Sequence, residues 1–304
     1  MPNNSVVRKK SVVAQPFVKW AGGKRKLLNI LESQLPVDLG YQTNVTYIEP
    51  FVGGGAMLFH MLNTFPNIRR VVINDINKDL IKCYQLVKNN PHELIDLLQP
   101  FEQRHNGLDE HERKAYFYEM RKTFNDGTLD DNLRAAYFMF LNHTCFNGLY
   151  RENGKGIYNV PVGKYKNPQI CDVDIIMADH KVLSKVDIFC GDYKKVFSHL
   201  GKGYNFIYFD PPYRPLPGTN NFNQYSKSGF SDHEQEELKV FCDSLTNKGC
   251  KFLLSNSDSD NPDGSSYFET LYEGYTLRRL LAPRSISADG KKRKKQSEVL
   301  IQNY

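Results

Sequence analysis

The chain has 304 residues, of which 40% are hydrophobic and 24% charged, a balance typical of a folded globular protein and unlike that of a disordered chain. No run approaches the roughly 20 apolar residues of a membrane span, and the first residues lack the apolar core of a secretory signal, so we expect a cytoplasmic protein without membrane contact. The formal net charge of +6 slightly favours a polyanionic partner, whereas the six cysteines lack C-x-x-C spacing and predict neither a disulfide framework nor a metal site.

The first part of the chain predicts a flexible arm followed by a strand-helix-strand unit. Residues 1–14 are polar, include a basic cluster and show no hydrophobic periodicity. Residues 46–62 have the pattern of a short strand, a glycine-rich turn and an amphipathic helix, and residues 71–75 have that of the next strand. Parallel strands joined by a crossover helix are the economical arrangement of such a unit.

Residues 91–173 break this rhythm and predict an inserted domain. Helical patterns continue to Asn142, after which the sequence FNGLYRENGKGIYNVPVGKY is rich in glycine, asparagine, tyrosine and basic residues. Its N-G and G-K-G steps favour tight turns. We therefore expect a β-hairpin that presents aromatic and cationic side chains to a ligand.

The remaining part of the chain alternates between strand and helix patterns again. Residues 205–213 form an apolar run that two prolines stop, residues 232–245 have a helical pattern, and residues 251–257 predict a further strand. Residues 275–282 and 297–304 look like a hairpin that gives the sheet an antiparallel edge.

Together these elements predict an α/β fold with a doubly wound, mostly parallel, Rossmann-like sheet. The sheet domain would comprise residues 15–90 and 174–304, and residues 91–173 would form the helical and hairpin insertion. Residues 278–295 carry many more basic than acidic side chains. This local charge suits phosphate groups, although a solvated charged loop has the same composition.

The glycine-rich turn and Asp75 together predict a site for an adenosine-type ligand. The turn from Gly53 to Gly55 follows a strand and opens a helix, so that its backbone can approach a ligand closely. Asp75 ends the next predicted strand, where an acidic side chain in doubly wound folds accepts hydrogen bonds from ribose hydroxyls. Leu58 stands where the dinucleotide pattern G-x-G-x-x-G has its last glycine, which favours a ligand without a pyrophosphate.

The sequence DPPY at positions 210 to 213 has the groups that activation of an exocyclic amine requires. An amine conjugated with a purine ring is a poor nucleophile, so a carboxylate and a backbone carbonyl must accept its hydrogens and localise the nitrogen lone pair. Asp210 and the Pro211 carbonyl are suited to that role. Tyr213 offers an aromatic face for a base extruded from a duplex, and Pro212 with its neighbour keeps the turn rigid.

FVKWAGGK, EPFVGGG, IND and DPPY, in this order and with an insertion between them, resemble the motifs of the Dam-type DNA adenine methyltransferases of the D12 class, alpha group. The resemblance covers nearly everything after residue 14. It implies methyl transfer from S-adenosylmethionine to N6 of adenine in duplex DNA, without a metal. It assigns catalysis to Asp210, Pro211, Pro212 and Tyr213. It assigns cofactor binding to Trp20, Ala21, Gly22, Lys24, Glu49, Phe51, Gly53, Gly55, Asp75, Asp192, Tyr193 and Asp210.

The same resemblance implies that residues 91–173 form a target-recognition domain for duplexes that contain GATC. Arg151 would read a guanine, Leu149 and Pro161 would make apolar base contacts, and Phe146 would fill the space of the extruded base. The positions around Arg151 match the GATC-reading members less closely than the catalytic motifs do. The other implied DNA contacts are Lys19, Asn147, Asn153, Lys164, Tyr165, Arg284, Ser285, Ser287 and Lys292. A cognate restriction endonuclease that acts on the same site without direct binding would be a further partner.

Four other functions are weighed against this one. A cytosine-N4 methyltransferase would use the same acceptor motif, because its target amine poses the same problem. Cytosine C5 transfer needs a reactive thiolate, and no cysteine here follows a proline. A nicotinamide-dependent dehydrogenase gives no role to the DPPY sequence or the basic loop. A non-catalytic DNA-binding module would account for the cations and would leave Asp210 and the glycine turn without a purpose.

Overall fold

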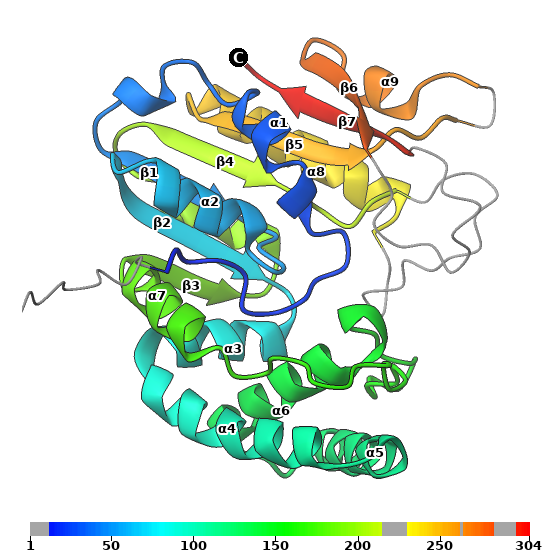
Figure 1. Cartoon of the computed structure of the whole chain (residues 1–304). Coiled ribbons are helices and arrows are strands. Elements are labelled where there is room, and N and C mark those ends of the chain that lie inside the picture. Colours follow the sequence, from blue (N-terminus) through cyan, green and yellow to red (C-terminus); the bar gives the residue numbers. More distant parts are fainter. Residues whose placement is uncertain (1–11, 215–229, 262–263, 283–295) are drawn as a thin grey trace, which may run out of the picture.

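The computed structural model describes residues 12–214, 230–261, 264–282 and 296–304 (Figure 1). Most of the predicted arm and the whole of the basic loop at 283–295 lie outside the described residues. The predicted phosphate contacts on that loop, namely Arg284, Ser285, Ser287 and Lys292, are therefore not placed by the structure.

The centre of the fold is a seven-stranded sheet with the strand order β3-β2-β1-β4-β5-β7-β6. The five strands β1 to β5 run parallel, and β7 runs antiparallel to both of its neighbours. The strands are β1 (Val45–Glu49), β2 (Ile68–Asp75), β3 (Val186–Cys190), β4 (Asn205–Phe209), β5 (Lys251–Ser257), β6 (Thr276–Ala282) and β7 (Gln296–Gln302). The strand order reverses between β1 and β4, which is the place where open α/β sheets bind ligands at the carboxyl ends of their strands. The predicted doubly wound, mostly parallel sheet is confirmed.

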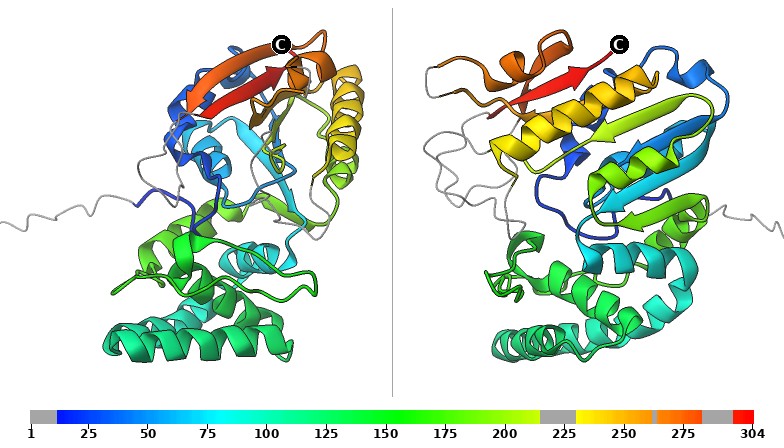
Figure 2. Two further views of the ribbon diagram at one scale, coloured as in Figure 1. Left: turned by 90° about the vertical axis from the view of Figure 1, so that its right-hand side faces the viewer. Right: turned by 180° about the vertical axis from the view of Figure 1, so that it is seen from behind.

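Helices cover both faces of the sheet, because successive strand residues point to opposite sides. Tyr47 of β1 belongs to one buried hydrophobic cluster with α2, and its neighbour Ile48 belongs to a second cluster with α8. Figure 2 shows α8 on the opposite side of the sheet from α1 and α2. The helices are α1 (Leu28–Glu32), α2 (Ala56–Thr64), α3 (Lys78–Asn89), α4 (Pro91–Gly107), α5 (Glu110–Asp126), α6 (Asp131–Thr144), α7 (Val173–Leu183), α8 (Asp232–Asn247) and α9 (Tyr267–Leu271). Short 3₁₀ helices occupy Lys24–Lys26, Leu39–Tyr41, Phe146–Gly148 and Tyr193–His199.

Three helices, α4 to α6, make up the first part of the predicted insertion and lie beyond the β3 edge of the sheet (Figure 1). Asp109 and Asp130 cap α5 and α6 with side-chain bonds to backbone N–H groups. Buried residues of these helices, such as Phe117 and Phe140, belong to the same hydrophobic cluster as Tyr84 of α3. The insertion is therefore packed against the sheet domain through a continuous core. No helix in the described part of the chain has the length and apolar character to span a membrane.

The predicted hairpin after α6 is present only as a loop with isolated antiparallel bridges. Cys145 bridges to Val162, and Glu152 bridges to Tyr158. Asn153 caps the tip, since its Oδ1 accepts from the N–H groups of Lys155 and Ile157 at 3.0 and 3.1 Å. Backbone bonds join the two arms at both bridges, for example from Asn159 N–H to the Arg151 carbonyl at 3.1 Å, but the pairing does not extend into regular strands. We name residues 145–165 the recognition loop, after the role that the sequence resemblance predicts for them.

The C-terminal hairpin is confirmed, and with it the predicted antiparallel edge of the sheet. The antiparallel strand β7 lies between β5 and β6, and β6 forms the edge. This order follows from burial: Val299, Leu300 and Ile301 of β7 are all buried, whereas Arg278 and Arg279 of β6 are exposed. A strand with apolar residues on both faces is more stable inside the sheet, where both faces are covered. A strand with exposed charged side chains can form the edge.

Candidate active site

Acidic residues stand at the ends of four neighbouring parallel strands, β1 to β4. Glu49 ends β1, Asp75 ends β2, Asp192 follows β3 and Asp210 follows β4. Because the strands are parallel and adjacent, their carboxyl ends meet at one edge of the sheet. The structure thus brings together carboxylates that are far apart in the sequence.

The glycine turn between β1 and α2 is tied to Asp75. The backbone N–H of Gly53 donates to Asp75 Oδ2 at 3.0 Å, and the N–H of Asn77 donates to Oδ1 at 2.9 Å. Gly53 and Gly55 have positive φ values of 47° and 74°, and a Cβ at Gly53 would lie 2.8 Å from the Trp20 ring nitrogen. The turn therefore requires glycine both for its backbone conformation and for the close approach of Trp20.

Burial raises the pKa values of two of these carboxyl groups, and repulsion between neighbouring carboxylates adds to the effect at Glu49. Burial raises the pKa of Glu49 well above its usual range, and the nearby carboxylates of Asp210 and Asp75 raise it further. Glu49 accepts a hydrogen bond from the Tyr47 hydroxyl at 2.8 Å. Burial also raises the pKa of Asp75, against the lowering effect of its backbone donors. A positive charge brought to this edge would relieve the repulsion.

An aromatic cluster lies beside the same edge. The rings of Phe51 and Tyr193 are 5.1 Å apart, and Phe230 packs edge-on against Phe51 at 5.9 Å. Asp192 is exposed and caps the following 3₁₀ helix by accepting from the N–H of Lys194 at 2.7 Å. The Tyr193 hydroxyl is buried without a hydrogen-bond partner among the described residues. The cluster offers flat apolar surface next to the polar strand ends.

Asp210 is bound by a lysine from the N-terminal part of the chain. Lys24 Nζ lies 2.9 Å from Asp210 Oδ1, and the Ser255 hydroxyl donates to the same oxygen at 3.1 Å. Burial alone would lower the pKa of Lys24, but the carboxylates of Asp210 and Glu298 raise it above its ordinary value. The lysine is therefore a cation at neutral pH, and it orients one side of the Asp210 carboxylate.

Tyr213 is held at both its ring and its hydroxyl. The hydroxyl donates to Glu298 Oε2 of β7 at 3.0 Å, and Lys24 Nζ lies 4.4 Å from the ring centroid. Burial raises the pKa of Glu298, while the positive charge of Lys24 lowers it. Lys24, Asp210, Tyr213 and Glu298 thus form one polar cluster around the end of β4.

The N-terminal segment of residues 19–24 connects this cluster to the recognition loop. Trp20 packs over the glycine turn and stacks on Tyr150 with ring centroids 6.3 Å apart. The backbone N–H of Lys19 donates to Asn142 Oδ1 at 2.8 Å, and Asn142 Nδ2 donates to the carbonyls of Lys19 and Gly148 at 2.8 and 3.1 Å. Ala21 and Gly22, with φ of 78° at Gly22, form the bend between Trp20 and Lys24.

The predicted DNA contacts are spread along the recognition loop rather than clustered at the strand ends. Arg151 is exposed, and its Nε donates to Asn159 Oδ1 at 2.7 Å. Lys19 Nζ lies 3.8 Å from the centroid of the Tyr165 ring. Exposed positions on this loop include Phe146, Asn147, Arg151, Asn153, Pro161 and Lys164, whereas Leu149 is partly buried.

Comparison with known proteins identifies the chain. The profile of the D12 class N6 adenine-specific DNA methyltransferases matches residues 20–286. The chain belongs to this family. It is 44% identical over 293 residues to the type II methyltransferase M.MjaIII of Methanocaldococcus jannaschii, with 95% of this chain and 99% of that protein covered. It is 36% identical to the type II methyltransferase M1.LlaDCHI of Lactococcus lactis, with 99% of each covered. It is 34% identical to the DNA adenine methylase of Vibrio cholerae, with 93% and 94% covered.

Membership in the D12 class decides the reaction. The protein is a DNA methyltransferase that acts on N6 of adenine. The dehydrogenase and the cytosine methyltransferases are set aside, and so is a module without catalysis. Within the described residues, no group of three or more His, Cys, Asp or Glu side chains is arranged to hold a metal ion.

Four residues of this D12 class methyltransferase that contact the predicted site were not found from the sequence. Ser255 and Glu298 bind Asp210 and Tyr213, Tyr84 donates to the carbonyl of Gly53 at 3.0 Å, and Asn142 ties Lys19 to the recognition loop. Ser255 and Glu298 lie on strands whose sequence signal is only a short apolar run. Their pairing with the site follows from the order of strands β4, β5 and β7, which local pattern does not reveal.

Proposed function

We propose that this enzyme transfers a methyl group from S-adenosylmethionine to N6 of adenine within GATC in double-stranded DNA. The observation that carries the chemistry is the environment of Asp210. Both of its described contacts, from Lys24 and from Ser255, fall on Oδ1. They orient the carboxylate so that Oδ2 is the oxygen we assign to one hydrogen of the target amine, while the Pro211 carbonyl accepts the other.

The strand ends fit the chemistry of the methyl donor. S-adenosylmethionine supplies a methyl group on a positively charged sulfur, and its adenosine carries ribose hydroxyls and a flat base. The carboxylates of Asp210 and Asp75 raise the pKa of Glu49, and a cation bound at this edge would relieve that repulsion and favour the charged form of Glu49. We assign the ribose hydroxyls to Asp75 and the base to Phe51, Tyr193 and the neighbouring Asp192. The remaining assigned contacts are Trp20, Ala21, Gly22, Lys24, Gly53 and Gly55.

The target adenine must leave the duplex to reach these acceptors, because its N6 is paired inside the helix. Tyr213 supplies the surface on which the extruded base would stack, and Glu298 fixes the ring by its hydroxyl. Pro211 and Pro212 limit the motion of the turn. Catalysis then rests on positioning the amine and on acceptors that are already in place when positive charge develops on nitrogen.

Recognition of GATC is assigned to the recognition loop and to the N-terminal segment. Arg151 is exposed and has the guanidinium fork that binds guanine O6 and N7 with two parallel N–H donors. We assign base contacts to Leu149 and Pro161, and we assign Phe146 to the space that the extruded adenine leaves in the base stack. Contacts to the DNA backbone or to bases are assigned to Lys19, Asn147, Asn153, Lys164 and Tyr165. Arg284, Ser285, Ser287 and Lys292 complete the proposed phosphate contacts.

The biological setting proposed from the sequence is protection against a restriction endonuclease that recognises the same site. The names of two relatives, both type II methyltransferases, support this proposal. The nuclease and the methyltransferase would share a DNA site without binding each other.

The test is methyl transfer from labelled S-adenosylmethionine into unmethylated duplexes with and without GATC, followed by nucleoside analysis. N6-methyladenine only in the GATC duplex supports both chemistry and site. N6-methyladenine in a different sequence would support the proposed chemistry and contradict the assignment of GATC as the site. Absence of transfer to any duplex contradicts the proposed mechanism.

A further inference from the structure

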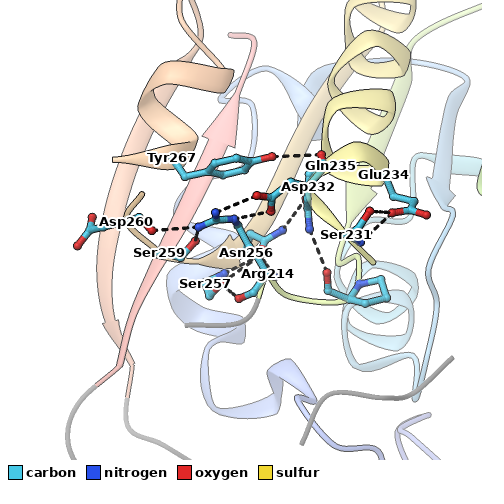
Figure 3. A network of polar contacts seen from close by, with 11 residues as sticks. Arg214, Ser231, Asp232, Glu234, Gln235, Asn256, Ser257, Ser259, Asp260 and Tyr267 are labelled. Carbon is cyan, nitrogen blue, oxygen red and sulfur yellow. Dashed lines mark hydrogen bonds and ion pairs between the residues drawn. The ribbon is translucent and has the colours of Figure 1, made fainter. Parts of the chain in front are cut away.

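Two fully buried side-chain amides, one on a helix and one on a strand, contact the chain at the turn of residues 210–213 (Figure 3). Gln235 lies on α8 and Asn256 lies on β5, and both have 0% of their surface exposed. Gln235 Nε2 donates to the carbonyl of Pro212 at 3.3 Å, and the backbone N–H of Arg214 donates to Asn256 Oδ1 at 3.1 Å. Asn256 Nδ2 in turn donates to Gln235 Oε1 at 3.2 Å. The two side chains therefore form a continuous bridge across the turn.

The bridge holds the peptide units on both sides of Tyr213. The peptide before this residue is bound through the Pro212 carbonyl, and the peptide after it is bound through the Arg214 N–H. The Tyr213 hydroxyl is bound separately by Glu298 at 3.0 Å. Hydrogen bonds thus hold the backbone on both sides of Tyr213 and the hydroxyl end of its ring. They leave the side chain little freedom to tilt.

We propose that Gln235 and Asn256 are positioning residues, which set the place of the Tyr213 ring and of the Pro211 carbonyl for the extruded base. This inference rests on the proposed function of Tyr213 as a stacking surface. Neither amide touches the reacting atoms. Each acts through the backbone of the turn, and a change of about 1 Å in such a turn reduces a reaction rate about 100-fold.

The side chain of Arg214 strengthens the same arrangement at the end of the turn. Its Nε and Nη2 bind Asp232 Oδ1 and Oδ2 at 2.7 and 3.0 Å, and its guanidinium carbon lies 4.0 Å from the centroid of the Tyr267 ring. Nη1 donates to the Ser259 hydroxyl at 3.2 Å (Figure 3). Bidentate pairs of this kind fix direction as well as distance. The chain leaving Tyr213 is thereby bound to the start of α8, the helix that carries Gln235.

The network consists of polar groups in a closed interior, so its loss has a cost in stability as well as in rate. Removing the Gln235 amide leaves the Pro212 carbonyl and Asn256 Nδ2 without their partner, which generally destabilises a fold. A loss of activity alone would not separate positioning from unfolding. The experiment therefore needs a control variant that also loses a buried glutamine amide but has no link to the turn.

Gln302 provides that control. It is a buried glutamine on β7 whose Nε2 donates to the backbone carbonyl of Tyr304 at 3.3 Å, the same kind of bond at the same distance as that of Gln235. It lies at the end of β7 that pairs with Leu253 and Thr276, away from the carboxyl ends of the parallel strands. Gln235→Met and Gln302→Met remove the same donor and keep a similar volume.

The measurement is the single-turnover rate of methyl transfer, together with the Kd values for S-adenosylmethionine and for duplex DNA. We expect Gln235→Met to lower the rate about 10- to 100-fold with both Kd values within about twofold of the wild type. We expect Gln302→Met to leave the rate unchanged. Arg214→Lys, which breaks the bidentate pair but keeps the charge, carries the same test and the same expectation if Gln235→Met does not fold.

Equal rates for Gln235→Met and Gln302→Met would overturn the positioning role, and so would a change confined to Kd. These results are distinct from failure of the proposed function. In that case the wild-type enzyme itself would transfer no methyl group to adenine, or Asp210→Ala would retain full turnover.

Discussion

Lys24 and Asp210 form an ion pair of 2.9 Å across 186 positions of sequence, with the lysine side chain 5% exposed and the aspartate side chain 23% exposed. The sequence resemblance assigns Lys24 to the methyl donor, and it assigns Asp210 both to catalysis on the target base and to the donor. On these assignments the methyl donor and the target base would both lie against one charged pair. A change at either residue is therefore expected to affect how the other is oriented.

Substitution of Lys24 separates these two roles. Lys24→Met removes the cation that orients Asp210 Oδ1, so we expect kcat to fall about 100-fold, as happens when one preorganised electrostatic contact is lost. We expect the Kd for duplex DNA to stay the same, and Lys24→Arg to restore part of the rate. A variant with normal kcat and a raised KM for S-adenosylmethionine would show that the lysine acts on the donor alone.

Substitution of Asp210 tests the acceptor directly. Asp210→Ala removes the only carboxylate assigned to the amine, and we expect no measurable turnover with DNA binding largely retained. Equilibrium binding to a labelled duplex and methyl transfer from labelled S-adenosylmethionine are measured on the same preparation. Parallel loss of DNA binding and turnover would instead indicate that the residue maintains the structure of the turn.

Gly55 and Tyr84 are expected to be coupled in stability. A Cβ at Gly55 would collide with the Tyr84 hydroxyl, and Gly55 has φ of 74°. We expect Gly55→Ala to destabilise the fold by about 1–3 kcal/mol. Tyr84→Phe removes the colliding oxygen, so the double variant should be about 1 kcal/mol more stable than the sum of the single changes predicts. Urea denaturation of the four proteins measures the coupling, and strict additivity would contradict the proposed collision.

Asp179 makes stability depend on pH. Burial raises the pKa of this α7 carboxyl to about 8, although the backbone N–H of Gln15 donates to its Oδ1 at 3.0 Å. Between pH about 4 and about 8 the folded chain holds a proton that the unfolded chain has lost, so the free energy of unfolding falls as pH rises through this window.

Asp179→Asn keeps an oxygen for the Gln15 N–H and removes the titration. We expect the stability of the variant relative to the wild type to increase from about pH 5 to about pH 8, by at most about 4 kcal/mol. Denaturant unfolding at several pH values measures this difference. Stability curves that stay parallel for the two proteins would refute the assignment to Asp179.

Most of the sheet could be predicted from the sequence, because its central strands carry strong local patterns. The apolar runs at 46–49, 71–75, 205–209 and 251–257 all lie within observed strands. β3 was not predicted, since the five residues of Val186–Cys190 are mostly half-buried and include an aspartate. The position of β7 between β5 and β6 depends on which strand is covered on both faces, and that is a property of the assembled sheet.

Site residues could be predicted from the sequence where one short motif holds both a turn and the reactive side chains. Residues that contact the site from distant strands could not be predicted. Asp75 ends one apolar strand and Asp210 directly follows another, so the fold class alone places them at one edge. Glu298, Gln235 and Asn256 contact the same turn from β7, α8 and β5. Their role depends on side-chain direction and strand order, neither of which a single sequence displays.

Arg151 is expected to determine which sequence is methylated. Its Nε donates to Asn159 Oδ1 at 2.7 Å, which restrains the guanidinium, and we expect its terminal nitrogens to bind a guanine edge in the major groove. Arg151→Ala should cost about 1–3 kcal/mol of discrimination at one base pair, so methylation of sites that differ from GATC there should increase relative to GATC.

A matched substitution on the basic loop distinguishes base recognition from general attraction to DNA. Lys292→Ala is expected to weaken binding to all duplexes to a similar degree and to reduce the slope of log affinity against log salt by about 1. Rates on GATC and on its single-base variants are compared for both substitutions over a range of salt concentrations. Unchanged site preference in Arg151→Ala, with a salt slope reduced as in Lys292→Ala, would mean that Arg151 contacts phosphate and that another residue reads the guanine.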